Sequence, residues 1–222
     1  MTYVFQFGDV FNSWDELAHG AWLTVRLSAL SMALGLILAI LCALARTAGP
    51  RPLRWLVAGY VEAIRNTPFL IQLFMVFFGL PALGLRLDAD TAALLAMVIN
   101  VGAYATEIVR AGIESISRGQ IEAGRALGLK PWQIFRHIVL LPAIQAVYPA
   151  LTSQFILLML NSSICSAIAA DELTAAANDI QSRTFRSFEA YFVVTGIYLA
   201  LSFAFSAVFA AIERGFLRRG RG

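Results

Sequence analysis

Long apolar segments separated by shorter polar ones dominate the chain. Five of them are long enough to cross a hydrocarbon core of about 30 Å, which takes about 20 helical residues. Their ranges are 21–45, 55–80, 89–109, 141–170 and 191–212. Backbone groups inside a bilayer must pair within the protein, so each range is predicted to be helical. The pattern predicts an all-α integral membrane protein with about five transmembrane helices.

Two of the five segments depart from a uniform apolar helix. Charged and polar residues and Pro68 interrupt the first half of 55–80. A proline inside a helix removes a hydrogen bond and bends or breaks the helix. The segment 141–170 is longer than one crossing requires, so it is predicted to be tilted or broken. The segment 191–212 contains no charged residue and is the clearest span.

Composition excludes an ordinary soluble domain. Hydrophobic residues make up 59% of the 222 residues, charged residues only 14%, and the mean hydropathy is +0.72. Soluble domains carry about 25% charged residues. Cys42 and Cys165 lie in different apolar segments, at membrane depths too different for a disulfide. His19 and His137 have no companions at metal-ligand spacing, so no metal site is predicted.

The distribution of positive charge predicts the orientation. Twelve of the 17 Lys and Arg residues lie in the first connection, the third connection and the C-terminal segment. Connections rich in Lys and Arg remain in the cytoplasm. We therefore expect a periplasmic N-terminal segment (1–20), a transmembrane domain (21–212) and a basic cytoplasmic tail (213–222). The tail could also be an anchor for anionic lipids.

The third connection, 110–142, has the signals of two short helices. Gly128 can adopt the left-handed conformation that ends the first helix, and Pro131 suits the first turn of the second. Its apolar side chains are numerous for an exposed connection, which favours contact with a partner protein over packing beneath its own bundle. They are Leu127, Leu129, Trp132 and Phe135.

The same connection resembles the EAA loop of bacterial ABC-importer permeases. That pattern is Glu-Ala-Ala, then Gly after three residues, then Ile-x-Leu-Pro after nine more. The corresponding residues are Glu122, Ala123, Gly124, Gly128, Ile138, Leu140 and Pro142. Gly124 replaces the second Ala of the pattern, and Pro142 lies one residue late. The resemblance implies that the first short helix inserts into a groove on an ATPase subunit and couples its closure to movement of the spans.

Polar residues inside the predicted spans form two groups, and such residues mark functional positions because they are costly in a bilayer. The first group is Glu62, Arg65, Asn66, Thr67 and Gln72, and the second is Asn161, Ser162 and Ser163. Together they could offer a cation to a carboxylate and acceptors to an ammonium group, as a small zwitterion requires. Alternatively, Glu62 and Arg65 could simply pair with each other, and the second group could only join helices.

The sequences 61–74, 103–113, 161–163 and 172–174 resemble polar amino-acid permeases of the histidine, glutamine and arginine group of ABC importers. The resemblance implies a type I importer permease fold. It also implies a substrate that is a polar amino acid or related small amine acid. Leu160 stands where many members of this group carry Lys. That difference is compatible with another ligand, or with recognition by a second permease chain.

The sequence contains no Gly-x-x-x-x-Gly-Lys-Ser/Thr motif, so the chain is predicted to be a non-enzymatic subunit without a cofactor of its own. By resemblance, an ABC ATPase binds ATP and Mg²⁺ for it. The other expected partners are a second permease subunit, identical or homologous, an external solute-binding protein and membrane lipid, in the bacterial inner membrane; nucleic acid is not expected. An ion-coupled secondary transporter or channel is the alternative, but inverted repeats are not evident. An intramembrane enzyme is disfavoured because neither histidine lies in mid-membrane.

Overall fold

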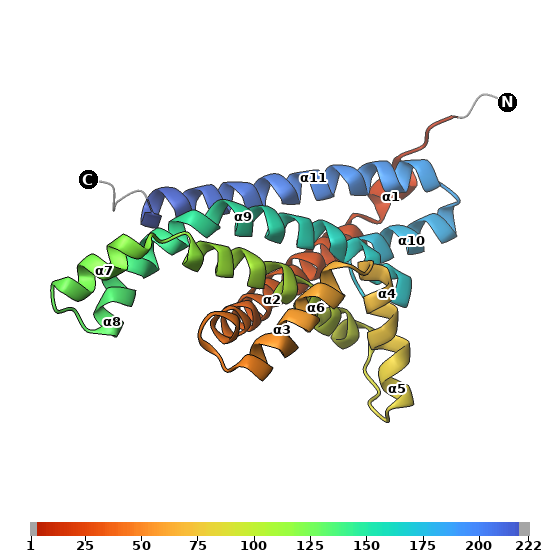
Figure 1. Cartoon of the computed structure of the whole chain (residues 1–222). Coiled ribbons are helices and arrows are strands. Elements are labelled where there is room, and N and C mark those ends of the chain that lie inside the picture. Colours follow the sequence, from red (N-terminus) through yellow and green to blue (C-terminus); the bar gives the residue numbers. More distant parts are fainter. Residues whose placement is uncertain (1–3, 218–222) are drawn as a thin grey trace.

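The computed structural model describes residues 4–217, and this part of the chain contains helices but no strand (Figure 1). The α-helices are α1 (Gly8–Asn12), α2 (Trp14–Ala48), α3 (Arg51–Arg65), α4 (Phe69–Phe74), α5 (Leu80–Ala82), α6 (Ala89–Glu114), α7 (Arg118–Ala126), α8 (Pro131–Ile134), α9 (Leu140–Asn161), α10 (Leu173–Thr184) and α11 (Ser187–Ile212). Three π-helical turns, η1 (Met75–Gly79), η2 (Phe135–Val139) and η4 (Glu213–Leu217), and one 3₁₀ segment, η3 (Ser162–Ile168), join or extend them.

Four helical segments are long and apolar enough to cross a membrane. They are Trp14–Ala48, Ala89–Glu114, Pro131–Ile168 and Ser187–Gly215. A fifth span is obtained if the bent pair Arg51–Arg65 and Phe69–Ala82 is counted as one. These spans confirm the predicted all-α membrane architecture.

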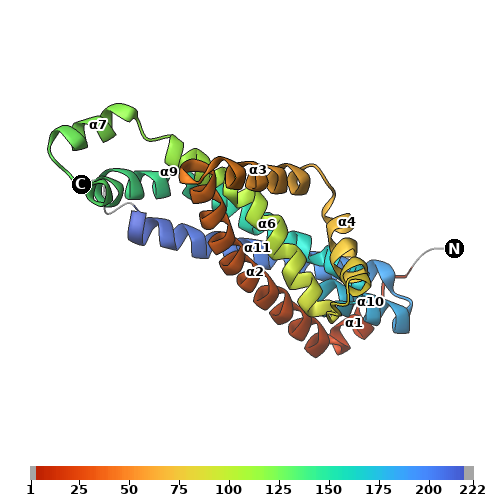
Figure 2. The same cartoon turned by 60° about the horizontal axis from the view of Figure 1, so that its bottom comes forward.

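The long helices run alongside one another, and the short elements project at their ends (Figure 1). α7 and α8 extend from one end of the molecule, whereas α1 and α10 lie at the other (Figure 1). α9 and α11 lie side by side, and α2 lies along α6 (Figure 2).

Small residues allow α2 and α6 to approach closely. Ser28 and Ser31 are buried on α2 in register with Gly35, whereas Thr24 on the same helix accepts a hydrogen bond from the N–H of Leu173 in α10. A Cβ atom on Gly35 would lie 2.2 Å from Cγ1 of Val101, so no side chain fits there. Small side chains at a membrane helix interface let backbones pack closely, and this contact forms the centre of the bundle.

The interruption predicted in the second span, 55–80, is confirmed, and it divides the span into two helices. The chain forms α3, breaks at Asn66–Pro68, and continues into α4 at an angle of 112°. Pro68 is the physical cause, because it cannot donate to the preceding turn and forces the residue before it out of the helical region.

The predicted fourth span is part of a longer continuous helix. α8, η2, α9 and η3 together form one segment from Pro131 to Ile168. The second short helix of the 110–142 connection is therefore the beginning of this span and not a separate element. The π-turn η2 joins the two parts.

The helices of the first and last spans are also longer than predicted. α2 begins at Trp14, inside the segment expected to be periplasmic, and α11 begins at Ser187. η4 extends α11 into the predicted basic tail, and the tail residues 218–222 lie outside the described part of the chain. Cys42 and Cys165 are both buried and free, as predicted.

Candidate functional site

The 110–142 connection folds as a helix, a tight turn and a second helix. Ser117 caps α7, since its side chain accepts a hydrogen bond from the backbone N–H of Gln120. α7 ends at Gly128, whose φ is +75°, in the left-handed region predicted for it. The N–H of Gly128 donates to the carbonyl of Arg125 (2.9 Å) and that of Leu129 to the carbonyl of Gly124 (3.1 Å). These two bonds are the Schellman arrangement that ends a helix at a left-handed residue.

Gly124 is the buried contact between the two helices of the connection. A Cβ atom there would lie 2.6 Å from Cδ1 of Ile138 and 3.2 Å from Cγ1 of Ile134. The departure from Ala at this position therefore has a packing reason, because Ile138 occupies the space of the missing methyl group. Ile134 and Ile138 belong to an apolar cluster that holds α7 against α8 and η2.

The opposite side of the connection is exposed. Glu122 and Ala123 face outward on α7, and Leu127 keeps 80% of its surface exposed. Trp132 is 57% and Phe135 46% exposed. The predicted coupling residues thus divide between this exposed face and the packed Gly124–Ile138 side. Leu140 and Pro142 lie in the first turn of α9, where both are exposed.

The first polar group lies at the break between α3 and α4, and its side chains donate hydrogen bonds to carbonyls in the last turn of α3. Asn66 donates from Nδ2 to the carbonyl of Glu62 (2.8 Å) and to its carboxylate (3.0 Å). The hydroxyl of Thr67 donates to the carbonyl of Ala63 (2.8 Å). Irregular backbone is tolerated at membrane depth only where its polar groups find partners, and these side chains supply them.

Gln72 fixes the bend to a neighbouring helix. It is buried, and its Nε2 donates to the carbonyls of Ile64 (2.7 Å) and Thr67 (2.9 Å). Its Oε1 accepts a hydrogen bond from Nδ2 of the buried Asn100 on α6 (2.8 Å). The nitrogen and the oxygen of the Gln72 amide are thus both hydrogen-bonded within the protein. Sequence reasoning missed Asn100 because its partner is 28 positions away.

Glu62 and Arg65 are exposed and do not pair with each other in the described residues. The Arg65 guanidinium lies over the Tyr104 ring, 5.7 Å from its centroid. Arg65 also lines a cavity of about 470 Å³ with Glu107, Arg110 and Ser115 of α6 and its flank, and with residues of α9. The cavity therefore presents both signs of charge.

The second polar group lies where α9 passes into η3. The Ser162 hydroxyl donates to the carbonyl of Met159 (2.7 Å) and the Ser163 hydroxyl to that of Leu160 (2.8 Å). Asn161 is the last residue of α9 and is partly exposed. Between residues 4 and 217 no hydrogen bond joins this group to the Glu62–Gln72 group.

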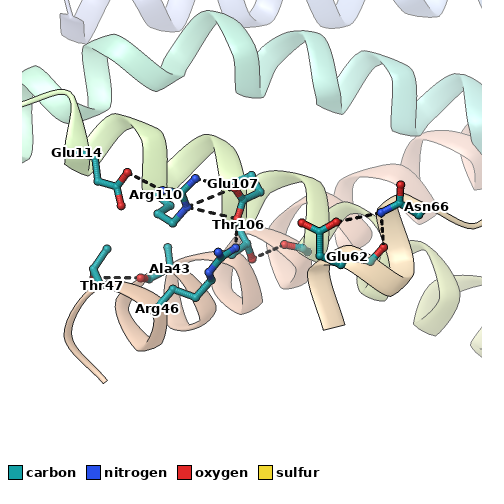
Figure 3. Close-up of polar contacts among 10 residues, drawn as sticks. Ala43, Arg46, Thr47, Glu62, Asn66, Thr106, Glu107, Arg110 and Glu114 are labelled. Carbon is teal, nitrogen blue, oxygen red and sulfur yellow. Dashed lines mark hydrogen bonds and ion pairs between the residues drawn. The ribbon is translucent and has the colours of Figure 1, made fainter. Parts of the chain in front are cut away.

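An ion-pair network joins α2 to α6 (Figure 3). Arg46 from α2 reaches Glu107 on α6, and Glu107 also accepts from Arg110 (2.8 Å). Arg110 in turn pairs with Glu114 (2.5 Å). The spacing of Glu107, Arg110 and Glu114 along α6 is visible in the sequence. The contact between Arg46 and Glu107 is not, because it joins residues 61 positions apart. Unlike these, the pairs of Glu122 with Arg118 or Arg125 suggested by spacing are not formed in the described residues.

Comparison with known proteins shows the family to which the chain belongs. Residues 34–218 match the family described as "Binding-protein-dependent transport system inner membrane component". The chain belongs to this family. It is 39% identical over 202 residues to the "L-cystine transport system permease protein TcyB" of Bacillus subtilis, covering 90% of this chain and 86% of that one. It is 35% identical to the "Glutamine transport system permease protein GlnP" of Escherichia coli, covering 89% of this chain and 91% of that one.

A solved structure supports the same assignment. A chain from the "Crystal structure of an amino acid ABC transporter with histidines" superposes with a TM-score of 0.89 at 33% identity, covering 96% of this chain and 99% of that chain. The fold is also that of the "MetNI methionine ABC transporter" in an inward-facing conformation, at 22% identity and a TM-score of 0.71. The predicted resemblance and membrane permease fold are confirmed.

Proposed function

We propose that this chain is the permease subunit of an ATP-driven importer for a polar amino acid or a related small amine acid. The observation that carries the proposal is the α7–Gly128–α8 connection, exposed on one face, in a member of a binding-protein-dependent transport family. The relatives named for cystine and glutamine support an amino-acid substrate. The secondary-transporter alternative offers no role for this connection.

The partner proteins of the chain and its placement in the membrane follow from the same family assignment. An ABC ATPase binds ATP and Mg²⁺ and docks on the Glu122–Gly128 face, where Leu127 and Trp132 supply apolar contact. A solute-binding protein delivers the substrate outside the bacterial inner membrane. A second permease, identical or homologous, completes the path, because five helices surround a solute poorly. The N-terminus lies in the periplasm and the C-terminus in the cytoplasm, in accord with the basic connections.

Movement passes from the docking face to the spans through one helix. Pro131–Ile168 is continuous, so it connects α8 at the docking face with Asn161 and Ser163 at its far end. α6 is held to the same helix at Gly112, where a Cβ atom would lie 2.0 Å from Cγ1 of Val147. A displacement of α7 and α8 by the ATPase therefore moves α9 and α6 together, with the π-turn η2 as the place of bending.

The substrate path passes the exposed charges that the break leaves available. Arg65 offers a cation to a carboxylate, and Glu62 and Glu107 offer acceptors to an ammonium group. Asn161 and Ser163 lie near the end of the moving helix and line the path there, whereas Ser162 is fully buried. Leu160 lacks the cation found in many relatives, so carboxylate recognition in this subunit depends on Arg65.

Uptake and co-purification together test the proposal. The tagged chain, purified in mild detergent from cells that carry its native partners, is expected to bring down a Walker A ATPase. A valine at Gly128 is strained at φ +75°, although a Cβ atom there would meet no neighbour within 4 Å. G128V is expected to lose the ATPase and substrate uptake while inserting normally, whereas G119A, at an open helical position of α7, retains both. Uptake driven by an ion gradient without ATP, or full activity of G128V, would refute the assignment.

A further inference from the structure

A cationic cavity lies at the end of α2, away from the α7–α8 docking face. Its volume is about 510 Å³, and it lies between the end of α2, the first half of α3 and the end of α6. The lining residues are Arg46, Arg51, Arg54, Trp55, Ala58, Arg110 and Glu114. Four guanidinium groups thus face one carboxylate.

Two of the four arginines have no internal counter-charge. Arg46 and Arg110 are paired with Glu107, and Arg110 also with Glu114. No carboxylate of residues 4–217 lies within ion-pair distance of Arg51 or Arg54. Two free guanidinium groups beside a cavity suit an oxyanion, and the planar fork of arginine binds phosphate in a bidentate manner.

Exposed apolar side chains lie on the same helix as Arg51 and Arg54, and one of them, Trp55, lines the cavity. Trp55 is 78%, Leu56 71% and Leu53 42% exposed, although α3 buries Val57 and Val61 against α2. The helix therefore has an apolar surface in addition to the one that packs inward. Tryptophan is enriched at the membrane–water interface. A free phosphate would use only the arginines, whereas a phospholipid would use the arginines with its headgroup and the apolar side chains with its acyl chains.

We propose that this cavity is a binding site for the phosphodiester of an anionic phospholipid. Arg51 and Arg54 bind the phosphate, Arg46 and Arg110 form the floor of the site, and Trp55 contacts the glycerol and upper acyl chain. Basic cavities between membrane helices bind anionic lipid headgroups in the same way. Because the floor is the α2–α6 ion-pair network, the lipid also stabilises the junction of these two helices (Figure 3).

The test measures binding to the full-length chain purified in neutral detergent with its co-purifying subunits. The probes are dioctanoyl phosphatidylglycerol, dioctanoyl phosphatidylcholine and inorganic phosphate, and the readout is the Kd from native mass spectrometry or thermophoresis. Phosphatidylglycerol is expected to bind more tightly than the other two. R51Q/R54Q is expected to weaken it about 30-fold, at about fivefold for each basic residue. R51K/R54K keeps the charge and should keep most of the affinity.

R86Q/R118Q is the matched control, since it removes the same charge from two exposed positions outside both the cavity and the Glu122–Gly128 face. Binding in this variant is expected to stay within about twofold of the parent. If R51Q/R54Q does not fold, R54Q alone is expected to weaken binding about fivefold. Equal weakening by the control pair, or no weakening by R51Q/R54Q, would overturn the site. Displacement of phosphatidylglycerol by an equal concentration of inorganic phosphate would overturn the lipid as its occupant.

Discussion

The hydrogen bond between Gln72 and Asn100 is expected to hold the α3–α4 bend against α6. Both side chains are buried, at 8% and 5% exposure, and Oε1 of Gln72 is 2.8 Å from Nδ2 of Asn100. Gln72 also saturates the carbonyls of Ile64 and Thr67. Replacing Gln72 with leucine keeps a similar volume but leaves these carbonyls and the Asn100 amide without their partner. Removing one partner of a buried hydrogen bond costs about 1–3 kcal/mol.

A double-mutant cycle separates the contribution of the Gln72–Asn100 hydrogen bond from that of the other hydrogen bonds of Gln72. Q72L is expected to cost about 2 kcal/mol of unfolding free energy, because it strands groups on two helices. N100L strands only Oε1 of Gln72 and is expected to cost about 1 kcal/mol. The double variant should cost about 2 kcal/mol rather than 3, because the interhelical bond contributes about 1 kcal/mol once.

The assay is reversible unfolding in mixed micelles, followed by far-ultraviolet circular dichroism and by a fluorophore placed on α4. S206A is the control, since this exposed hydroxyl on α11 bonds only to the carbonyl of Ser202 (2.8 Å). It is expected to change stability by less than about 0.5 kcal/mol. A coupling energy below about 0.3 kcal/mol between Q72L and N100L would refute the reasoning that this amide pair fixes the bend.

Three further predictions follow from single contacts. G128N is expected to retain more ATPase binding and uptake than G128V, because asparagine tolerates the left-handed conformation of residue 128. An equal loss of binding and uptake in the two variants would show that side-chain size matters instead. G124A is expected to lower thermal stability by crowding Ile138, and G124A/I138V to regain it by removing Cδ1; no recovery would place the strain elsewhere. Burial raises the pKa of Glu172 above its ordinary value of 4.5, so the native state holds a proton that the unfolded state has lost. The melting temperature is therefore expected to be highest below pH 4.5 and to fall as pH rises through the raised pKa, with a smaller slope in E172Q; equal slopes would contradict this.

Local signals were sufficient for the helices and for the turn of the docking connection. Gly128 and Pro131 act on their own neighbours, so their effect on the backbone could be predicted from the sequence. Pro68 predicted an interruption, but no local pattern reveals the 112° angle or the hydrogen bond by which Gln72 joins the bend to Asn100. The packing reason for Gly124 could not be predicted either, because Ile138 contacts it only once η2 has packed against α7.

Non-local electrostatics were the least predictable part of the site. The positions of Glu107, Arg110 and Glu114 along one helix are compatible with mutual pairs, and these form. Arg46 was assigned only to the positive charge of the first connection, yet it completes the network between α2 and α6. Charge counting predicts the side of the membrane on which a connection lies, whereas the pairing of a given arginine depends on which helix ends meet.

The break in the second span separates two roles among its polar residues. Gln72 donates to the carbonyl of Ile64, which Pro68 leaves without a helical donor, and it also binds α6. Asn66 and Thr67 donate to carbonyls in the last turn of α3. These three side chains are already used to stabilise irregular backbone. The Arg65 guanidinium, in contrast, has its charge exposed in a cavity that also contains Glu107. A polar cluster in a membrane span therefore need not be a ligand site throughout, because the bend that creates the cavity itself consumes most of the polar groups.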